Sequence, residues 1–431
     1  MLLIFTHKIT NRLTYTAKQI FERILGMEIT FTTKVEDFIK HSGPKMTYSK
    51  QPLQNEFFIR SNDLLFEQGI NDVDIKVSDW DGIPCFFACG EKSTLPFDIF
   101  SASFFLLTRY EEYLPHVKDS VGRFPVKESI AYQHKFLEMP VVDLWAHKLL
   151  VALKERFPNL ERKEREYSFT SIINVTTSHA YAMRGLVRTL GGFFLDFGNF
   201  KFRDVVDRFS VLLGIKKDPY DNFFELIDIH KKFPIKTMFF FQFAKHSAHD
   251  KNISINNNKF RYLIKSVADY SVVSLSTSFL SSTNKVELKE EKKQLGNLIN
   301  RPINYSRLRY NRVNVPAAYR NLVETEFTDD FSMGYTHEIG FRAGTCTPFH
   351  FYDINMEVRQ PLKVHPFAMH DYALVDYRNK EEVFEKMDRV YRMVKQVKGE
   401  FVMVFSNELL GGKHKMDWME LYQSFLKRYY V

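Results

Sequence analysis

Charged side chains follow five of the strands that the sequence predicts, at the place where each strand ends. Carboxylates and guanidinium groups gathered at one edge can exchange hydrogen bonds with the hydroxyl groups of a sugar. They can also pair with one another as a purely structural ion network. The sequence leaves both interpretations open. The five residues are Arg307, Asp330, Arg342, Asp371 and Glu408.

Five histidines near the strand ends raise the alternative of a metal site. Neutral imidazole is a good zinc ligand, and the rings could converge with Asp330 or Asp371. Their spacing matches no known metal motif, which favours surface or hydrogen-bonded histidines instead. A triad of Ser178, His179 and Asp330 is disfavoured, because adjacent side chains diverge and no GxSxG sequence occurs. The five histidines are His179, His246, His249, His350 and His370.

Strands alternate with helices from about residue 165 onward. Apolar runs such as KTMFFFQF are typical of buried strands, and the amphipathic stretches between them are typical of helices. This alternation predicts a parallel sheet with helical crossovers, whose functional residues lie beyond the carboxyl ends of the strands. The expected strands are Tyr167–Thr176, Lys236–Phe243, Ser271–Phe279, Asn304–Tyr310 and Phe401–Phe405, with short strands near Phe331, Gly340–Ala343 and Leu362–Phe367.

Residues 1–160 predict a smaller α+β domain. Leu2–Thr6 is an apolar strand, and Thr10 can cap a helix that ends near Gly26. Pro158 and the charged stretch Glu161–Glu166 then mark a boundary. We therefore expect two domains, at residues 1–160 and 165–431.

The composition of the chain excludes several classes of protein. Its 431 residues are 45% hydrophobic, as in ordinary globular proteins. The net charge is +8, and the basic residues are interspersed with acidic ones. Nucleic-acid binding is not expected, since no one-sided basic stripe occurs. Only three cysteines are present, so a reducing compartment is expected. No apolar run predicts a membrane span and no signal peptide is evident, which together indicate the cytoplasm.

Long strings of mixed polarity carry a resemblance to a known family. They are TDDFSMGY with GFRAGTCTPFHFYD in Thr328–Asp353, and LLTRYEEYLP, DSVGRFP and MPVVDLW in Leu106–Trp145. The chain resembles the polysaccharide deacetylase family (NodB-type, carbohydrate esterase family four), in a bacterial branch with an extra N-terminal domain. The resemblance covers most of the chain, more weakly before about residue 90. It implies an α/β fold in which a distorted (β/α) barrel follows a smaller α+β domain. It also implies a divalent metal, usually zinc, and removal of acetyl groups from glycans.

The sequence departs from this family at the positions that hold the metal and the catalytic groups. The family pattern has two aspartates after the first strand and histidines in three later segments. Here these positions hold hydroxyl side chains or arginine, whereas catalytic zinc needs about three ligands from His, Cys or carboxylate. The resemblance thus implies a scaffold with a degenerate metal site. The degenerate positions are Thr176, Ser178, Ser276, Arg309 and Ser406.

These observations predict a polysaccharide deacetylase-like protein of cell-surface glycan metabolism that works as a glycan-binding or accessory pseudoenzyme. Its expected partners are a glycan or glycan precursor and an enzyme of a cell-surface polysaccharide pathway, and no cofactor is expected. One alternative is an active deacetylase, or another hydrolase of C–N or ester bonds, with relocated catalytic residues. Zinc would belong to that alternative if the histidines converge. A third interpretation is a scaffolding protein that uses the barrel only as a surface.

Overall fold

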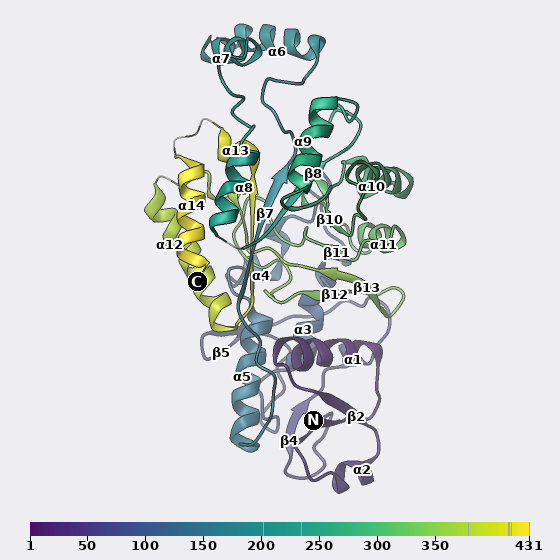
Figure 1. Cartoon of the computed structure of the whole chain (residues 1–431). Coiled ribbons are helices and arrows are strands. Elements are labelled where there is room, and N and C mark those ends of the chain that lie inside the picture. The colour runs from purple at the N-terminus through teal and green to yellow at the C-terminus, as the bar shows by residue number, and fades with distance from the viewer. Residues whose placement is uncertain (201, 234, 378, 413, 415, 431) are drawn as a thin grey trace.

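The chain folds into a mixed α/β structure built around one curled sheet of nine strands (Figure 1). The computed structural model describes residues 1–200, 202–233, 235–377, 379–412, 414 and 416–430. A smaller N-terminal sheet lies at one end of the molecule, and a pair of helices projects from the other (Figure 1). The predicted boundary between residues 1–160 and 165–431 stays a prediction.

The nine-stranded sheet has the order β12-β13-β11-β10-β9-β8-β7-β15-β14 and curls into a half-barrel. All neighbouring strands are parallel except β12 and β13. Parallel pairing brings the carboxyl ends of eight strands to one edge, which is the edge where a site was expected. The strands are β7 (Ser168–Val175), β8 (Lys236–Gln242), β9 (Val272–Ser276), β10 (Tyr305–Arg307), β11 (Asp329–Asp330), β12 (Phe349–Asp353), β13 (Val358–Val364), β14 (Met369–His370) and β15 (Glu400–Ser406).

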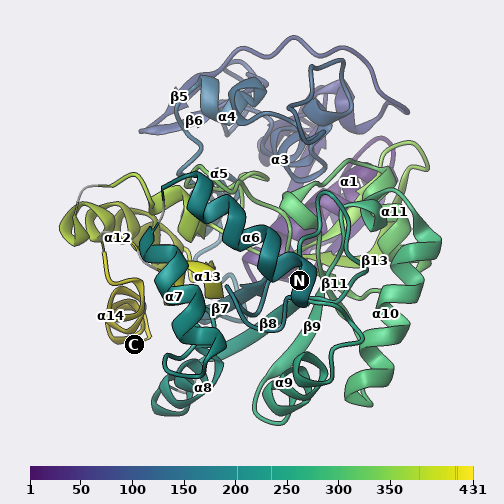
Figure 2. The ribbon, with the colours of Figure 1, turned by 90° about the horizontal axis from the view of Figure 1, so that it is seen from above.

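Helices surround the curled sheet (Figure 2). Most of them connect one parallel strand to the next, as the alternation in the sequence predicts. They are α6 (Leu186–Gly198), α7 (Phe202–Leu212), α8 (Phe223–Lys232), α9 (Asn258–Ala268), α10 (Lys285–Ile299), α11 (Ala317–Glu324), α12 (Lys380–Gln396), α13 (Asn407–Gly411) and α14 (Trp418–Tyr429). Short 3₁₀ turns lie at Leu280–Ser282, Arg309–Asn311 and Asp371–Leu374.

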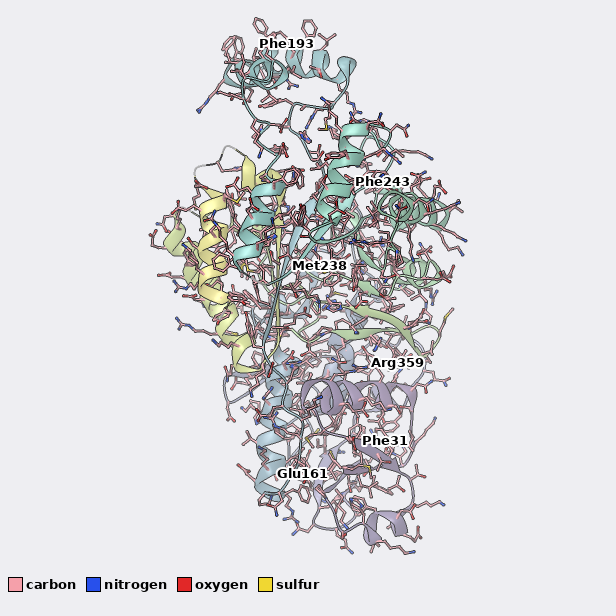
Figure 3. The ribbon with its side chains drawn as sticks, viewed as in Figure 1. Phe31, Glu161, Phe193, Met238, Phe243 and Arg359 are labelled. Carbon is pink, nitrogen blue, oxygen red and sulfur yellow. The ribbon has the colours of Figure 1, made fainter. Side chains whose placement is uncertain are left out.

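Both faces of the central strands are apolar because each face packs on a different core. On β8, Met238 and Phe240 point into the half-barrel, where they pack with Phe331 and Phe367. Figure 3 labels Met238 at the centre of the molecule. The alternate residue Phe241 faces the surrounding helices. This two-residue alternation with apolar side chains on both faces explains the continuous run in the sequence.

The N-terminal region contains a four-stranded sheet of order β2-β1-β3-β4, with every pair parallel. Thr10 caps the first helix as expected, since its hydroxyl accepts from the Leu13 amide at 3.1 Å. The elements are β1 (Leu2–Phe5), α1 (Asn11–Lys18), a π-helical turn (Gln19–Ile24), β2 (Ile29–Thr32), α2 (Val35–Lys40), β3 (Lys45–Ser49), β4 (Phe57–Arg60), a 3₁₀ turn (Asp63–Leu65), a hairpin of β5 (Ser78–Trp80) and β6 (Ile83–Cys85), α3 (Ile99–Leu107), 3₁₀ turns at Tyr110–Glu112 and Val126–Glu128, α4 (Ile130–Gln133) and α5 (Val141–Arg156).

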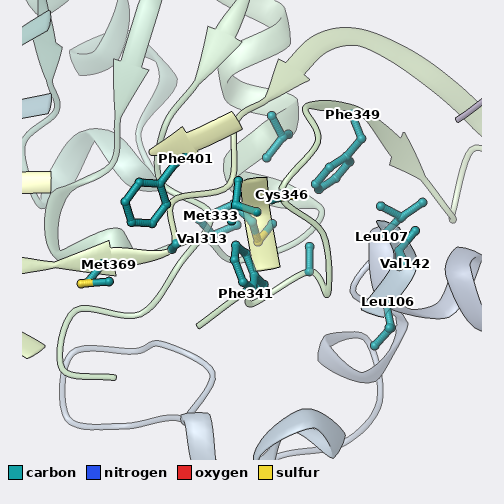
Figure 4. Packing of buried hydrophobic residues seen from close by; sticks show 14 of the residues in the cluster. Leu106, Leu107, Val142, Val313, Met333, Phe341, Cys346, Phe349, Met369 and Phe401 are labelled. Atoms are coloured by element: carbon teal, nitrogen blue, oxygen red, sulfur yellow. The ribbon is translucent and has the colours of Figure 1, made fainter. Parts of the chain in front are cut away.

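The expectation of a strand at Gly340–Ala343 is wrong, because this segment is a turn packed against the N-terminal region. The amide of Phe341 donates to the Leu137 carbonyl at 2.8 Å. At Gly340, whose φ is +136°, a Cβ would lie 2.3 Å from that same carbonyl oxygen. The turn therefore needs glycine at a close backbone approach. Figure 4 shows Phe341, Met333 and Cys346 beside the apolar side chains of α3 and α5.

No helix in the described ranges has the length and apolarity required to cross a membrane.

A buried histidine, just after β13, lies between two carboxylates at the starts of β11 and β15. His365 contacts Asp329 through Nε2 at 2.7 Å and Glu400 through Nδ1 at 3.1 Å. Burial opposes the charge on His365, but the two hydrogen bonds outweigh it and raise the pKa. Burial likewise opposes the charge on Glu400, but the His365 contact outweighs it and lowers the pKa to about 2. The three groups thus form a charged cluster that stabilises the fold.

The stability that this cluster supplies should depend on pH in a defined direction. A raised pKa means that the His365 contribution is complete below the unfolded value near 6.5 and is lost as the pH rises through the folded value. The Glu400 contribution is present above its unfolded value of 4.5 and is lost as the pH falls toward 2. His365→Gln should therefore lower the free energy of unfolding by about 1–3 kcal/mol at about pH 6, and by less at about pH 8. Urea unfolding at both pH values measures this.

The exposed His246 provides the matched control, because its ring is not part of a buried cluster. His246→Gln should leave the free energy of unfolding within about 0.5 kcal/mol of the unchanged protein at both pH values. Equal destabilisation by His365→Gln at the two pH values would contradict a charged role for the cluster.

Candidate functional site

A cavity of about 330 Å³ lies at the carboxyl edge of the sheet. Its walls come from the ends of β7, β9, β10 and β14 and from the start of α13, together with a loop of the N-terminal region. This location agrees with the general rule for parallel sheets. The side chains on which its chemistry depends are Arg123, Asn174, Thr176, Ser276, Arg307, Arg309, Tyr310, His370, Tyr372 and Glu408.

Arg309 places a fixed positive charge in the cavity wall. Its guanidinium donates to the Thr176 hydroxyl at 3.0 Å, and its Nε lies 3.6 Å from a carboxylate oxygen of the buried Asp250. The same guanidinium lies over the Tyr310 ring, 4.3 Å from the ring centroid. These contacts hold the side chain in one orientation, with its charge beside the strand ends.

Arg307 brings a second guanidinium, which is buried and donates hydrogen bonds to two neutral groups. It donates to the Phe331 carbonyl at 2.6 Å and to the Asn311 amide oxygen at 2.8 Å. Burial lowers its pKa to about 10, although the charges of Asp330 and Asp371 oppose the shift. Arg307 is therefore still protonated at neutral pH. No carboxylate of the described residues lies within ion-pair distance of this guanidinium, which favours an anionic or strongly polar group in the adjacent cavity.

The loop after β10 adopts an unusual backbone to line the cavity. Tyr310 and Asn311 both have left-handed conformations, with φ values of 57° and 52°. Such conformations cost about 1–3 kcal/mol each for most residues and persist where surrounding contacts enforce them. Here Arg123 donates to the Tyr310 carbonyl at 3.1 Å, and Asn311 donates to the Thr336 hydroxyl at 2.9 Å. The loop thus fixes the Tyr310 ring at the cavity wall.

A histidine paired with an aspartate lines the opposite wall. Nδ1 of His370 lies 2.6 Å from a carboxylate oxygen of Asp371, whose other oxygen accepts from the Ser406 amide at 2.5 Å. Burial lowers the pKa of His370 despite the neighbouring carboxylate. Glu408 lines the same cavity, and burial raises its pKa while Arg309 opposes the shift. A neutral imidazole and a carboxyl group with a raised pKa are the usual components of acid–base chemistry.

Three of the five charged residues singled out in the sequence do not line this cavity. Asp330 is fully buried beneath it and accepts from Ser306 at 3.0 Å and from Ser332 at 2.8 Å. Arg342 is buried against Glu112 of the N-terminal region, with contacts of 2.9 and 2.7 Å. Arg307 and Glu408 line the cavity directly, Asp371 holds His370 from behind it, and Arg342 lines the second cavity described below.

The degenerate positions divide into two groups. Thr176, Ser276 and Arg309 line the cavity together. Ser178 and Ser406 are buried behind it: Ser178 contacts Nδ1 of His179 at 2.9 Å, and Ser406 contacts Asp371. Hydroxyl groups and a guanidinium are not the donor set of a catalytic zinc ion, and the Arg309 cation would repel a divalent metal. The residues at these positions do not fit the metal that the resemblance implies.

The five histidines are dispersed over the molecule. Only His370 among them lines the cavity at the strand ends. His179 lines a separate cavity below α6, the exposed ring of His249 stacks on Phe279, and His246 is exposed. His350 lines a third cavity, on the side of the N-terminal region. Within the described parts of the chain, no three His, Cys, Asp or Glu side chains are grouped to hold a metal ion.

Several cavity residues were not singled out from the sequence, among them Arg123, Asn174 and Tyr372. Arg123 comes from the N-terminal region, where it pairs with Asp119 at 2.7 Å and bonds the Tyr310 carbonyl. Tyr372 lies in the 3₁₀ turn that follows His370, and Asn174 precedes Thr176 by two residues on the same face of β7. Because side chains two residues apart on a strand point to the same face, Asn174 can be inferred as a cavity residue once Thr176 is assigned to the cavity. No local sequence pattern identifies Arg123 in this way.

A second cavity of about 230 Å³ adjoins the first. The two share Arg123, Tyr310, Asn311, Thr336 and His337 in their walls. The second cavity adds residues of the N-terminal region to the lining, among them Asp119, Phe124 and Lys127.

Comparison with known proteins gives one match at the level of protein families. Residues 2–158 match the model of a family of unknown function, DUF7033. No match is found among curated proteins.

Solved structures with a similar chain path include three enzymes or candidate enzymes. A candidate polysaccharide deacetylase from Mycobacterium smegmatis is 11% identical, with a TM-score of 0.40 over 62% of this chain and 85% of that one. The allantoinase Puue is 10% identical, with a TM-score of 0.38 over 61% and 84%. A 4-alpha-glucanotransferase from Thermococcus litoralis is 14% identical, with a TM-score of 0.35 over 62% and 37%. At these sequence identities and TM-scores, the similarity assigns neither an activity nor a ligand to this chain.

Proposed function

We propose that the cavity at the strand ends and the second cavity beside it bind a segment of a glycan. The site prefers sugars that carry an acidic group, and binding uses no metal. The observation that carries this proposal is the position of Arg309. Its guanidinium lies among the strand-end residues where the resemblance to polysaccharide deacetylases implies a divalent cation, and it bonds Thr176 at 3.0 Å. A fixed organic cation can bind a carboxylate or phosphate group on a sugar, but it cannot activate water as a metal does.

The other walls of the cavity suit a sugar as well. Asn174, Thr176 and Ser276 offer amide and hydroxyl groups for hydrogen bonds to sugar hydroxyls. Tyr310 and Tyr372 offer aromatic rings next to them. The second cavity lengthens the site along the Tyr310 loop, which suits a chain of sugars better than a single one. This supports the assignment to glycan metabolism that the sequence motifs imply.

A ligand panel with the unmodified protein tests the proposal. Tetrameric galacturonate should bind more tightly than neutral chitotetraose, by about tenfold at low salt, because each ion pair with a guanidinium adds about 1.5–3 kcal/mol when it is shielded from water. Calorimetric titration at low and high salt measures the two affinities.

A chelator provides the control for metal. Titration of the acidic oligosaccharide in the presence of EDTA should give the same affinity, and zinc-loaded protein should retain no stoichiometric zinc after dialysis. Binding that disappears with EDTA and returns with zinc would overturn the proposal. Equal, weak binding of both oligosaccharides would do so as well.

One observation favours a second candidate, hydrolysis without a metal. His370 is held by Asp371 at 2.6 Å and shares the cavity with Glu408, whose pKa burial raises. In such a site His370 would take a proton from water as the new C–O bond forms at an acyl carbon. Glu408 would then donate its proton to the leaving nitrogen or oxygen. Release of acetate from acetylated oligosaccharides that is lost in His370→Gln, but retained in EDTA, would favour this candidate over simple binding.

A further inference from the structure

The helical hairpin formed by α6 and α7, residues 186–212, exposes an apolar face to solvent. The exposed side chains recur at intervals of four and three residues on each helix, which is the spacing of one helical face. Between residues 186 and 215, no described side chain belongs to a buried hydrophobic cluster. Phe194 is 71% exposed. The face consists of Leu190, Phe194 and Phe197 on α6 and Phe202, Val206 and Phe209 on α7.

The hairpin has a defined structure in spite of this exposure. The rings of Phe193 and Phe209 pack edge to face with centroids 5.1 Å apart, and Arg208 pairs with Asp196 at 2.5 Å. At its base, Arg188 donates to the Asn252 carbonyl at 2.9 Å. Figure 3 labels Phe193 at the outer end of the molecule, away from the core residues. An apolar face displayed on a projecting hairpin marks an interaction site.

The charges around this face point to an anionic partner. Between residues 184 and 217 the sequence has seven basic and three acidic residues. Asp207 is buried, Asp196 and Asp204 are half-buried, and Asp196 and Asp207 pair with Arg208 and Lys216. Among the described residues of this stretch, the exposed charged side chains are Arg203, Lys216 and Lys217. A second copy of the chain would bring like charges together across a symmetric contact.

We propose that the α6–α7 hairpin docks on the surface of an anionic lipid membrane. Phenylalanine and leucine on one face with basic residues at its edge are the combination found in helices that lie at a membrane surface. Docking through the hairpin does not depend on what the cavity binds.

The place of the hairpin in the fold gives docking a consequence for the cavity. The chain enters the hairpin directly from the end of β7, where Thr176 lines the cavity. Figure 1 shows α6 and α7 beyond the tip of β7, on the side of the carboxyl edge. A hairpin seated on a membrane therefore holds the cavity edge of the sheet toward that membrane. A glycan attached to a lipid is the form of ligand that this orientation serves.

Cosedimentation of the full chain with vesicles tests the proposal. The protein should bind vesicles that contain roughly a quarter phosphatidylglycerol at least tenfold more tightly than vesicles of phosphatidylcholine alone, at low ionic strength. Phe194→Ser/Phe197→Ser/Phe202→Ser should reduce binding to the anionic vesicles at least tenfold. Arg203→Glu/Lys216→Glu/Lys217→Glu should abolish the preference for anionic vesicles, since each basic residue contributes about fivefold.

Controls separate docking from misfolding and from self-association. Val117→Ser/Val286→Ser/Met356→Ser removes equally exposed apolar side chains elsewhere and should leave vesicle binding unchanged. The serine variants of the hairpin should keep the thermal midpoint and the oligosaccharide affinity of the unmodified protein, because these residues lie outside the core. Failure of the unmodified protein to bind anionic vesicles would overturn the proposal. A lipid-free dimer that the phenylalanine variant dissociates would assign the face to a second copy instead.

Discussion

Replacing Glu112 by glutamine should destabilise the protein by about 3–5 kcal/mol. Glu112 lies between two buried arginines: it contacts Arg342 at 2.7 and 2.9 Å and Arg109 at 2.7 Å, and all three side chains are at most 2% exposed. Burial disfavours the Glu112 charge, but the two guanidinium groups outweigh it and lower the pKa. Glutamine keeps the shape and removes the charge, which leaves two buried cations with insufficient compensation.

Urea unfolding followed by tryptophan fluorescence measures this effect. The matched control is Glu164→Gln, which removes solvent-screened contacts to Arg162 and Lys398 and should leave the free energy of unfolding nearly unchanged. Arg109→Met/Glu111→Gln/Glu112→Leu/Arg342→Met, which also neutralises the Glu111 carboxylate that pairs with Arg109 at 2.7 Å, should recover much of the loss, because replacing a buried ion network by uncharged residues removes its desolvation penalty. A loss below about 1 kcal/mol in Glu112→Gln would show that the network is dispensable.

The largest effect on ligand binding should come from Arg309. Arg309→Gln keeps a hydrogen-bonding side chain but removes the charge at the cavity wall, so its affinity for tetrameric galacturonate should fall by about ten- to hundredfold. Chitotetraose binding should change by less than about threefold, because a neutral sugar loses at most one ordinary hydrogen bond. If Arg309 had only a structural role, its replacement would weaken the binding of both oligosaccharides to a similar extent.

Two further variants complete the calorimetric experiment. Arg307→Lys keeps a positive charge but loses the planar fork, and should also weaken galacturonate binding. Arg301→Gln, which removes a donor to the Ala268 carbonyl far from the cavity, should have no effect on either ligand. Equal losses for the acidic and neutral oligosaccharides in Arg309→Gln would argue against an acidic ligand.

The main course of the second half of the fold follows from local sequence patterns. The apolar run KTMFFFQF predicts β8, and the pattern of Phe223–Lys232 predicts α8 with the observed bounds. The alternation of such segments predicts a parallel sheet, and the parallel sheet brings Thr176, Ser276, Arg307 and Glu408 to one edge. This inference needs only the direction of the strands, which is why it does not require knowledge of the loops.

The parts that escaped prediction depend on partners distant in the sequence. Arg342 is a charged residue in a strand-like context, and its ion pair with Glu112, 230 residues earlier, places it in the wall of the second cavity rather than the first. Arg123 reaches the cavity because the N-terminal region folds over the Tyr310 loop. That loop has two consecutive residues in the left-handed conformation, which no pattern of side chains in the sequence predicts.

The pairing of β7 with β15 also determines when the nine-stranded sheet can form during synthesis of the chain. Residues 168–174 of β7 pair in register with residues 400–406 of β15, so the two strands are made more than 200 residues apart. Until the ribosome has delivered β15, the edge of β7 exposes unpaired backbone groups and an apolar surface. The N-terminal sheet, by contrast, pairs only strands within residues 2–60. The nascent chain thus carries an open sheet edge through most of its translation, the period in which chaperones have the most surface to bind.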